Sequence, residues 1–306
     1  VVRLLQITND ITVIDNLTDY GILDKDELQE LVNERLHIIN RAGLVELIIG
    51  NINDDTILHT SFLKNPSIVI HLASFPRAKV VNANPISGSE IMVTALIKLL
   101  NKCKETNVRR FVYVSSSMVY GDFENGVSEE EQCNPFGLYA IMKYTGELIV
   151  KDFCKSNNIE YVIVRPSAVY GPRDVEDRVV SKFFINAMAN KDIIVRGENE
   201  VLDFTYVNDA AMYIALTATS NNCANQTYNI TCGEGSTLLN AAKLVKQITN
   251  SSSRILIDGK DDAFPSRGVL SNKKVITDLR YSPTVSIQNG FTFYYAWLKY
   301  YSIFRS

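Results

Sequence analysis

Short runs that are apolar on nearly every residue alternate with longer amphipathic runs along most of this chain. A short β-branched run bounded by turn residues predicts a strand, and apolar residues spaced by three and four predict a helix. Strands that are apolar on both faces are typical of a parallel sheet with helices on each side. The pattern therefore predicts a doubly wound α/β fold. The expected strands are residues 11–15, 45–50, 68–73, 110–116 and 160–164, and the expected helices are residues 25–40, 87–106 and 136–156.

The pattern loosens after Arg165, where glycine and proline separate shorter elements. We therefore expect a larger domain over residues 1–165 and a smaller α/β lobe over residues 166–306, with some segments of the second part returning to the first. Residues 287–304 carry aromatic side chains at helical spacing, which predicts a packed terminal helix, with a partner-binding face as the alternative.

Composition excludes several classes of protein. With 31 Lys and Arg against 34 Asp and Glu, the net charge of −3 gives no electrostatic basis for binding nucleic acid or an anionic membrane. No stretch is apolar for long enough to span a bilayer, and the first residues lack the features of a secretory leader. Five scattered cysteines form no C-x-x-C pair and have no metal-site spacing with the three histidines. We therefore expect a reduced, cytoplasmic protein without a metal.

The first expected strand ends in Asp15, a residue type that can bind a dinucleotide. A carboxylate at this position accepts hydrogen bonds from both adenosine ribose hydroxyls and repels a 2′-phosphate, which favours NAD over NADP. An Asp at a strand end is otherwise a common turn residue. The fingerprint G-x-G-x-x-G, which lies about 20 residues before such an acid, is absent from the 14 residues ahead of Asp15. Since VVRLLQ reads as the interior of an amphipathic helix, we expect another strand and a glycine-rich turn to precede Val1.

A second glycine pair, Gly233-Glu234-Gly235, follows the strand-like TYNIT and precedes a helical run over residues 238–248. It lacks the third glycine and places a negative Glu234 where phosphates would bind. A turn between strand and helix is the simpler interpretation.

The most informative segment joins SSSMVYG, at the end of the strand over residues 110–116, to LYAIMK, near the start of the next helix. Tyr139 and Lys143 are four residues apart and share one helix face. A free tyrosine has a pKa near 10, but a lysine cation and an oxidised nicotinamide beside it favour the phenolate. Tyr139 is thus the expected proton acceptor, and the Ser117 hydroxyl can hydrogen-bond the same substrate oxygen.

Segments along the chain from Ile11 nearly to the C-terminus resemble the extended short-chain dehydrogenase/reductases, specifically the NAD-dependent nucleotide-sugar epimerase/dehydratase family. They are ITVIDN, IVIHLA, RFVYVSSSMVYG, LYAIMK, RPSAVYGPRD, LDFTYVNDAA and TYNITCGEGSTLLNAAKLV. The resemblance implies a Rossmann-like NAD-binding domain over residues 1–165, a second lobe that binds a nucleoside-diphosphate sugar, and a homodimer formed through helices 87–106 and 136–156.

The same resemblance implies specific roles. Ser117, Tyr139 and Lys143 are the catalytic residues. The implied cofactor contacts are Asp15, Asn16, Asn51, Ile52, Leu72, Ala73, Tyr139, Lys143, Pro166 and Ser167, with Asn51 standing where the family usually has Asp. The implied substrate contacts are Ser117, Met118, Ala168 and Arg267, although Arg267 can equally be read as a solvated loop residue.

Departures from the family pattern narrow the expected chemistry. Sugar-nucleotide 4,6-dehydratases follow the catalytic hydroxyl with an Asp-Glu pair, whereas Met118 and Val119 here cannot transfer protons. Leu202 replaces a frequent arginine, and Ala168 a frequent asparagine. We therefore expect an epimerase that works through a transient 4-keto sugar. A dehydrogenase, reductase or dehydratase of the same family is the alternative, followed by a non-catalytic dinucleotide-binding regulator. His71, at the end of a buried strand, is expected to be a packed or hydrogen-bonded residue.

Overall fold

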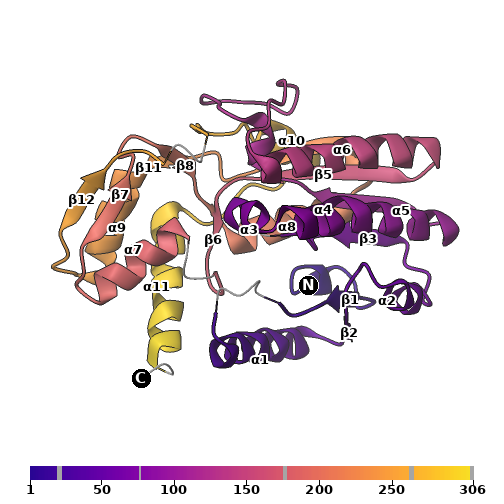
Figure 1. Cartoon of the computed structure of the whole chain (residues 1–306), viewed down its shortest axis with the longest axis horizontal. Helices are drawn as coiled ribbons and strands as arrows, with labels where there is room; N and C mark the ends of the chain where they lie inside the picture. Colours follow the sequence, from indigo (N-terminus) through magenta and orange to yellow (C-terminus); the bar gives the residue numbers. More distant parts are fainter. Residues whose placement is uncertain (19–22, 76, 175–177, 262–264, 304–306) are drawn as a thin grey trace. The chain divides into compact units, whose positions relative to one another are not determined.

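A computed structural model describes the chain except residues 19–22, 76, 175–177, 262–264 and 304–306 and the side chains of residues 301–303. The described residues form two compact units (Figure 1). Unit 1 consists of Val1–Tyr120, Cys133–Arg165 and Ala211–Tyr228. Unit 2 consists of Gly121–Gln132, Pro166–Ala210 and Asn229–Ser306.

Unit 1 is built on parallel strands, as the apolar runs predict. Strand β1 pairs with β2 in parallel, with Thr12 opposite Glu46, and β3, β4 and β5 pair in parallel in a four-stranded sheet of order β10-β5-β4-β3. The general doubly wound fold has its strands in the order 3-2-1-4-5-6 across the sheet. In that general numbering, β1 and β2 of this chain correspond to strands 2 and 3, and β3, β4 and β5 correspond to strands 4, 5 and 6. Among the described residues, no strand corresponds to strand 1. The strands are β1 (Thr12–Asp15), β2 (Glu46–Ile49), β3 (Ile68–His71), β4 (Arg110–Val114), β5 (Glu160–Pro166) and β10 (Gln226–Ile230).

The helices of unit 1 follow the predicted amphipathic runs closely. Helix α1 begins at a capping box, in which the Asp24 carboxylate accepts from the Glu27 N–H and the Glu27 side chain accepts from the Asp24 N–H. The helix expected over residues 87–106 instead consists of α4, a π-helical turn at Glu90–Thr94 and α5. The helices are α1 (Lys25–Ala42), α2 (Asp55–Ser61), α3 (Ala78–Ala83), α4 (Pro85–Ser89), α5 (Ala95–Glu105), α6 (Leu138–Ser156) and, over residues 211–219, α8 (Val207–Thr219).

The opening VVRLLQ forms only a 3-10 turn, Leu4–Gln6, in place of the expected amphipathic helix. So short a run closes few hydrogen bonds against the cost of helix nucleation. A mainly apolar core joins α5 and α6 to β4 and β5, and its members include Leu96, Leu100, Phe111 and Ile163.

Unit 2 packs helices against small sheets. Helix α11 buries Phe291, Tyr294 and Leu298 in its core, so the predicted terminal helix is indeed packed. The Tyr170 and Phe291 rings meet edge to face, with centroids 5.1 Å apart. The sheets are β12-β7, β11-β8 and β6-β9. The elements are β6 (Val169–Tyr170), β7 (Ile193–Arg196), β8 (Val201–Asp203), β9 (Thr205–Tyr206), β11 (Gly235–Thr237), β12 (Ile255–Asp258), α7 (Val179–Met188), α9 (Leu238–Thr249), α10 (Lys273–Leu279) and α11 (Ile287–Ile303).

Two local details differ from the sequence expectation. The segment expected to be a plain turn between strand and helix contains the short strand β11 before α9 begins. Residues 121–132 lie in unit 2, although a division at residue 165 assigns them to the first domain. The reason is their backbone pairing, since the Phe123 N–H donates to the Ser266 carbonyl and the Ser271 N–H donates to the Val127 carbonyl.

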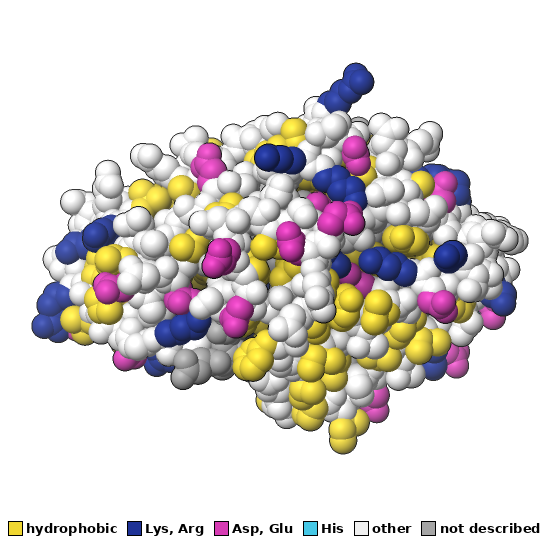
Figure 2. All heavy atoms as spheres, turned by 90° about the horizontal axis from the view of Figure 1, so that it is seen from above, with side chains coloured by type: hydrophobic (Ala, Val, Ile, Leu, Met, Phe, Trp, Pro, Cys, Tyr) yellow, Lys and Arg dark blue, Asp and Glu magenta, His cyan; other side chains and the backbone are white. Residues whose placement is uncertain are grey.

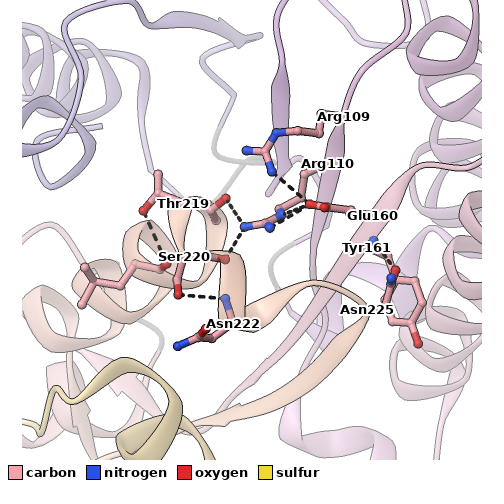
Figure 3. A network of polar contacts seen from close by, with 10 residues as sticks. Arg109, Arg110, Glu160, Tyr161, Thr219, Ser220, Asn222 and Asn225 are labelled. Carbon is pink, nitrogen blue, oxygen red and sulfur yellow. Dashed lines mark hydrogen bonds and ion pairs between the residues drawn. The ribbon is translucent and has the colours of Figure 1, made fainter.

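A buried arginine ties the start of β4 to the end of α8 within unit 1 (Figure 3). Arg110 is fully buried, and its Nη1 donates to the carbonyls of Ala218 and Ser220 at 2.9 and 2.6 Å. The last carbonyls of a helix have no partner within the helix, so a cation at this end satisfies them and complements the helix dipole. Arg110 Nε also donates to Glu160 at 2.8 Å, and Glu160 further binds the exposed Arg109.

Within the part of the chain that the structure describes, no helix combines the length and the apolar character needed to cross a membrane.

Candidate active site

Helix α6 brings Tyr139 and Lys143 together on one face, as their spacing predicts. The Lys143 ammonium nitrogen lies 6.0 Å from the centroid of the Tyr139 ring. It donates a hydrogen bond of 2.8 Å to the Val114 carbonyl at the end of β4. The Tyr139 ring packs beside a small apolar cluster that includes Phe75 and Met92. The lysine is therefore fixed by the sheet, and the tyrosine is fixed by the neighbouring helical segments.

Lys143 is buried at 5% exposure, and burial lowers the pKa of its ammonium to about 8, while the negative charge of Glu147 acts in the opposite direction. The nitrogen also lies 5.4 Å from the centroid of the Tyr113 ring, over which a cation is attracted. At neutral pH the lysine is charged, and its charge favours the Tyr139 phenolate.

Ser117 begins a short 3-10 turn, Ser117–Tyr120, that follows β4 and packs against α6. Its side chain is buried at 2% exposure. The next two residues, Met118 and Val119, are partly and fully buried respectively, and neither side chain can exchange a proton. Ser117 is thus the hydroxyl that this turn places near the end of β4.

The structure reveals a buried ionic network that the sequence analysis missed. The carboxylate of Glu147, on α6, receives two hydrogen bonds from the Arg165 guanidinium, at 2.9 and 2.6 Å, and one from the Ser115 hydroxyl at 2.6 Å. Arg165 also donates to the Tyr120 hydroxyl at 2.9 Å. The available signal was an acid four residues after Lys143, which places both on one helix face.

His71 ends β3 beside this cluster and is packed, in line with the sequence interpretation. Its ring stacks on Tyr113, with centroids 5.9 Å apart. Burial and, to a lesser extent, the charge of Lys143 together lower the pKa of the imidazole to about 3. His71 is therefore neutral at physiological pH and unsuited to be an acid in this range.

The buried neutral histidine predicts a pH dependence of stability. The pKa is about 3 in the folded protein and near 6.5 when unfolded, so the unfolded chain binds the extra proton first and stability falls as pH drops from 6.5 towards 3. Between pH 7 and pH 5 this group removes about 2 kcal/mol. Urea unfolding of wild type and His71→Phe at both pH values tests this, and equal losses in the two proteins contradict it.

Gly146 is required by close approach to Tyr113. A Cβ at this position overlaps the Tyr113 hydroxyl oxygen, so a side chain forces either α6 or the Tyr113 ring to move. We expect Gly146→Ala to cost about 1 to 3 kcal/mol and to lower activity, because Lys143 lies one turn away on the same helix. Tyr113→Phe removes the obstructing oxygen but keeps the ring carbon Cζ, which is also too close, so the double variant should regain part of the stability lost in Gly146→Ala. Urea unfolding measures it, and a double variant no more stable than Gly146→Ala contradicts it.

The carboxyl ends of β1, β2 and β3 present the residues expected to bind the cofactor in unit 1. Asp15 and Asn16 are exposed, and the Asp15 carboxylate accepts the Leu17 N–H at 2.7 Å. Its other oxygen is available to ribose hydroxyls, so this strand end fits a dinucleotide. Asn51 and Ala73 are also exposed, and Leu72 is 58% exposed, whereas Ile52 is buried.

The remaining expected contacts lie in unit 2. Pro166 is partly exposed, and Ser167 is buried with its N–H donating to the Ile230 carbonyl. Ala168 has a positive φ of 32°, a region that asparagine tolerates better than alanine. Arg267 is only partly exposed, and burial lowers the pKa of its guanidinium to about 10, against the opposing charge of Glu200. A weakly solvated cation of this kind attracts an anionic ligand.

Asp203, at the end of β8, is a structural acid in unit 2. Its carboxylate accepts the Leu270 N–H and the Cys232 thiol, both at 3.2 Å, and burial raises its pKa. In the described ranges no three residues among His, Cys, Asp and Glu gather into a metal site.

A parallel α/β sheet with an exposed acid at the end of β1, together with a helix that presents a tyrosine beside a buried lysine, defines a dinucleotide-dependent enzyme of the short-chain dehydrogenase/reductase type. The chain belongs to the NAD-dependent epimerase/dehydratase family, whose model matches residues 1–231. The predicted family and the cofactor NAD are thereby confirmed.

Known proteins similar to this chain agree with the family. An uncharacterized UDP-glucose epimerase of Bacillus subtilis is 28% identical over 236 residues, which cover 76% of this chain and 74% of that protein. A putative UDP-glucose 4-epimerase of Methanocaldococcus jannaschii is 26% identical over 303 residues, 97% of this chain and 93% of that protein. The crystal structure of UDP-glucuronic acid 4-epimerase from Bacillus cereus, in complex with UDP-glucuronic acid and NAD, superposes with a TM-score of 0.87 at 24% identity, covering 98% of this chain and 96% of that one.

Proposed function

We propose that this protein is an NAD-dependent nucleotide-sugar epimerase that inverts a sugar carbon through a transient 4-keto intermediate. The observation that carries the proposal is the pair of Tyr139 and the buried Lys143 on α6, with Ser117 at the adjoining end of β4. The B. subtilis and M. jannaschii relatives, described as UDP-glucose epimerases, support the substrate class.

Tyr139, as phenolate, takes the proton of the sugar hydroxyl, and the charge of Lys143 keeps the phenolate accessible near neutral pH. The Ser117 hydroxyl hydrogen-bonds the same sugar oxygen and orients it. When bound, NAD supplies the redox chemistry by accepting a hydride from the sugar carbon and returning it. After the keto sugar has rotated in the site to present its other face, Tyr139 gives back its proton. Only the configuration of the sugar carbon therefore changes.

The exposed ends of β1, β2 and β3 would hold the dinucleotide. Asp15 would bind the ribose hydroxyls. Further contacts, as the family resemblance implies, would come from Asn16, Asn51, Ile52, Leu72, Ala73, Pro166 and Ser167. Met118 and Ala168 would contact the sugar, and Arg267 would bind the diphosphate as a weakly solvated cation.

Met118 and Val119 distinguish epimerisation from dehydration, because eliminating water needs an acid and a base that these side chains lack. Incubation with UDP-, GDP-, CDP- and dTDP-sugars, followed by analysis of the product sugars, tests the proposal. We expect an epimeric sugar with no net change in NADH absorbance. Stoichiometric formation or loss of NADH would identify a dehydrogenase or reductase. The absence of any altered sugar would favour the remaining alternative, a non-catalytic dinucleotide-binding regulator.

We further propose that the protein is a cytoplasmic homodimer. None of the five cysteines, all of which lie in the described part of the chain, forms a disulfide, which suits a reducing compartment. Helices α5 and α6 each expose apolar side chains, with Ile97 on α5 at 40% and Ile141 and Leu148 on α6 at 45% and 51%. Figure 2 also shows hydrophobic side chains gathered in the lower middle of the view, below a band of mixed charges. Such patches mark interaction sites, and sedimentation should show a dimer that Leu148→Glu dissociates; a wild-type monomer contradicts this.

A further inference from the structure

Glu147 lies one helical turn after Lys143 on α6 and is fully buried. A lone buried carboxylate is costly, and this one is stabilised by the two-point contact with Arg165 and by the Ser115 hydroxyl. Arg165 is itself buried at 3% exposure, and its guanidinium lies over the Tyr120 ring, 4.8 Å from the centroid. The network therefore holds the Glu147 side chain in one position beside the lysine.

The charges around Lys143 show why this position matters. His71 on β3 is neutral, and burial raises the pKa of Tyr113 on β4, so both are uncharged near neutral pH. Arg165 on β5 is a cation paired with Glu147. Its positive charge disfavours the protonated form of Lys143. Tyr139 lies beside Lys143 on the same helix, and the Cys133 thiol, whose pKa burial raises, interacts with Arg165 and Glu147. Glu147 is the group whose negative charge counteracts the burial of the Lys143 ammonium.

We propose, on the basis of the proposed function, that Glu147 is a positioning residue of the active site: fixed by Arg165 and Ser115, its carboxylate keeps Lys143 charged and so maintains Tyr139 as a base. No part of Glu147 needs to contact the sugar or the dinucleotide. It acts through space on Lys143, whose own hydrogen bond goes to the Val114 carbonyl.

The proposal predicts a change in the shape of the pH profile. Activity needs the Tyr139 phenolate, which sets the acidic limb, and the Lys143 ammonium, which sets the alkaline limb. Without Glu147 the ammonium loses its proton at lower pH, and the weaker cation raises the pH at which Tyr139 ionises. The two limbs should approach each other by about 1 pH unit each, and activity at the optimum should fall about tenfold.

The principal variant is Glu147→Gln, which keeps the shape and removes the charge. Glu160→Gln is the matched control, because Glu160 pairs with Arg110 at the opposite end of the same strand β5. The control should lower the melting temperature and leave both limbs at their wild-type pH. If Glu147→Gln folds poorly, the double variant Glu147→Gln with Arg165→Met is used instead, because it removes both buried charges. The limbs of its pH profile should lie between those expected for Glu147→Gln and those of wild type.

A second readout separates this proposal from the proposed function. Ultraviolet difference titration of the protein without sugar, taken against Tyr139→Phe, reports the ionisation of Tyr139 directly. We expect Glu147→Gln to shift that ionisation to higher pH by about 1 unit. Unchanged titration and unchanged limbs in the folded Glu147 variants would overturn the proposal. If the wild type epimerises no sugar, the proposed function fails, and the titration still decides the role of Glu147.

Discussion

Tyr139→Phe should lower turnover by about 10²- to 10⁴-fold while NAD binding and the melting temperature stay close to wild type. The substitution keeps the ring that packs beside Phe75 and Met92 and removes only the ionisable oxygen. Lys143 retains its hydrogen bond to Val114, so the surroundings of the site are conserved. Turnover of the sugar found in the substrate panel and NAD titration measure the two effects separately.

Tyr144→Phe provides the matched control. Tyr144 lies on the same helix directly after Lys143 and is also partly buried, but it is five residues from Tyr139 and therefore on another helix face. We expect its turnover to stay within about twofold of wild type, as for surface changes away from a site. Near-normal turnover of Tyr139→Phe would disprove the assignment of Tyr139 as the base.

Arg110→Met should destabilise the protein by about 3 kcal/mol. The methionine fills part of the buried space but donates no hydrogen bond, so the carbonyls of Ala218 and Ser220 at the end of α8 lose their partner. Each buried acceptor left unpaired costs about 1 to 3 kcal/mol. Urea unfolding followed by circular dichroism measures the loss, and turnover of the folded fraction should change little because the network lies at the amino ends of β4 and β5.

Arg109→Met tests the same network from its exposed side (Figure 3). Arg109 binds the same carboxylate of Glu160 at 3.0 Å, but its side chain is 45% exposed and contacts no helix carbonyl in that network. Exposed ion pairs contribute about 0 to 1 kcal/mol, so we expect a loss below 1 kcal/mol. Equal losses for the two arginine variants would show that the ion pair with Glu160, rather than the cap on α8, carries the stability.

Local patterns predicted strands β1 to β5 and the longest helices of unit 1, whereas most short elements were found only in the structure. The apolar run of β4 is recognisable because both faces of a central parallel strand are buried, and Arg110–Val114 is buried along almost its whole length. The pairing of Tyr139 with Lys143 was predictable for a similar reason, since both lie on one helix and only the helical period is needed. The roles expected for Ser117, Asp15 and Arg267 stay predictions.

The sequence by itself determined what depends on near neighbours along the chain: strands β1 to β5, the longest helices, the Tyr139–Lys143 face and the family. Only the tertiary structure decided what depends on residues distant in sequence. It joined Glu147 to Arg165, placed the Tyr113 hydroxyl against Gly146, and put residues 121–132 beside residues 266–271. Periodicity reports which side of an element is buried, whereas burial of a charge or a close backbone approach is settled by the partner that long-range packing supplies.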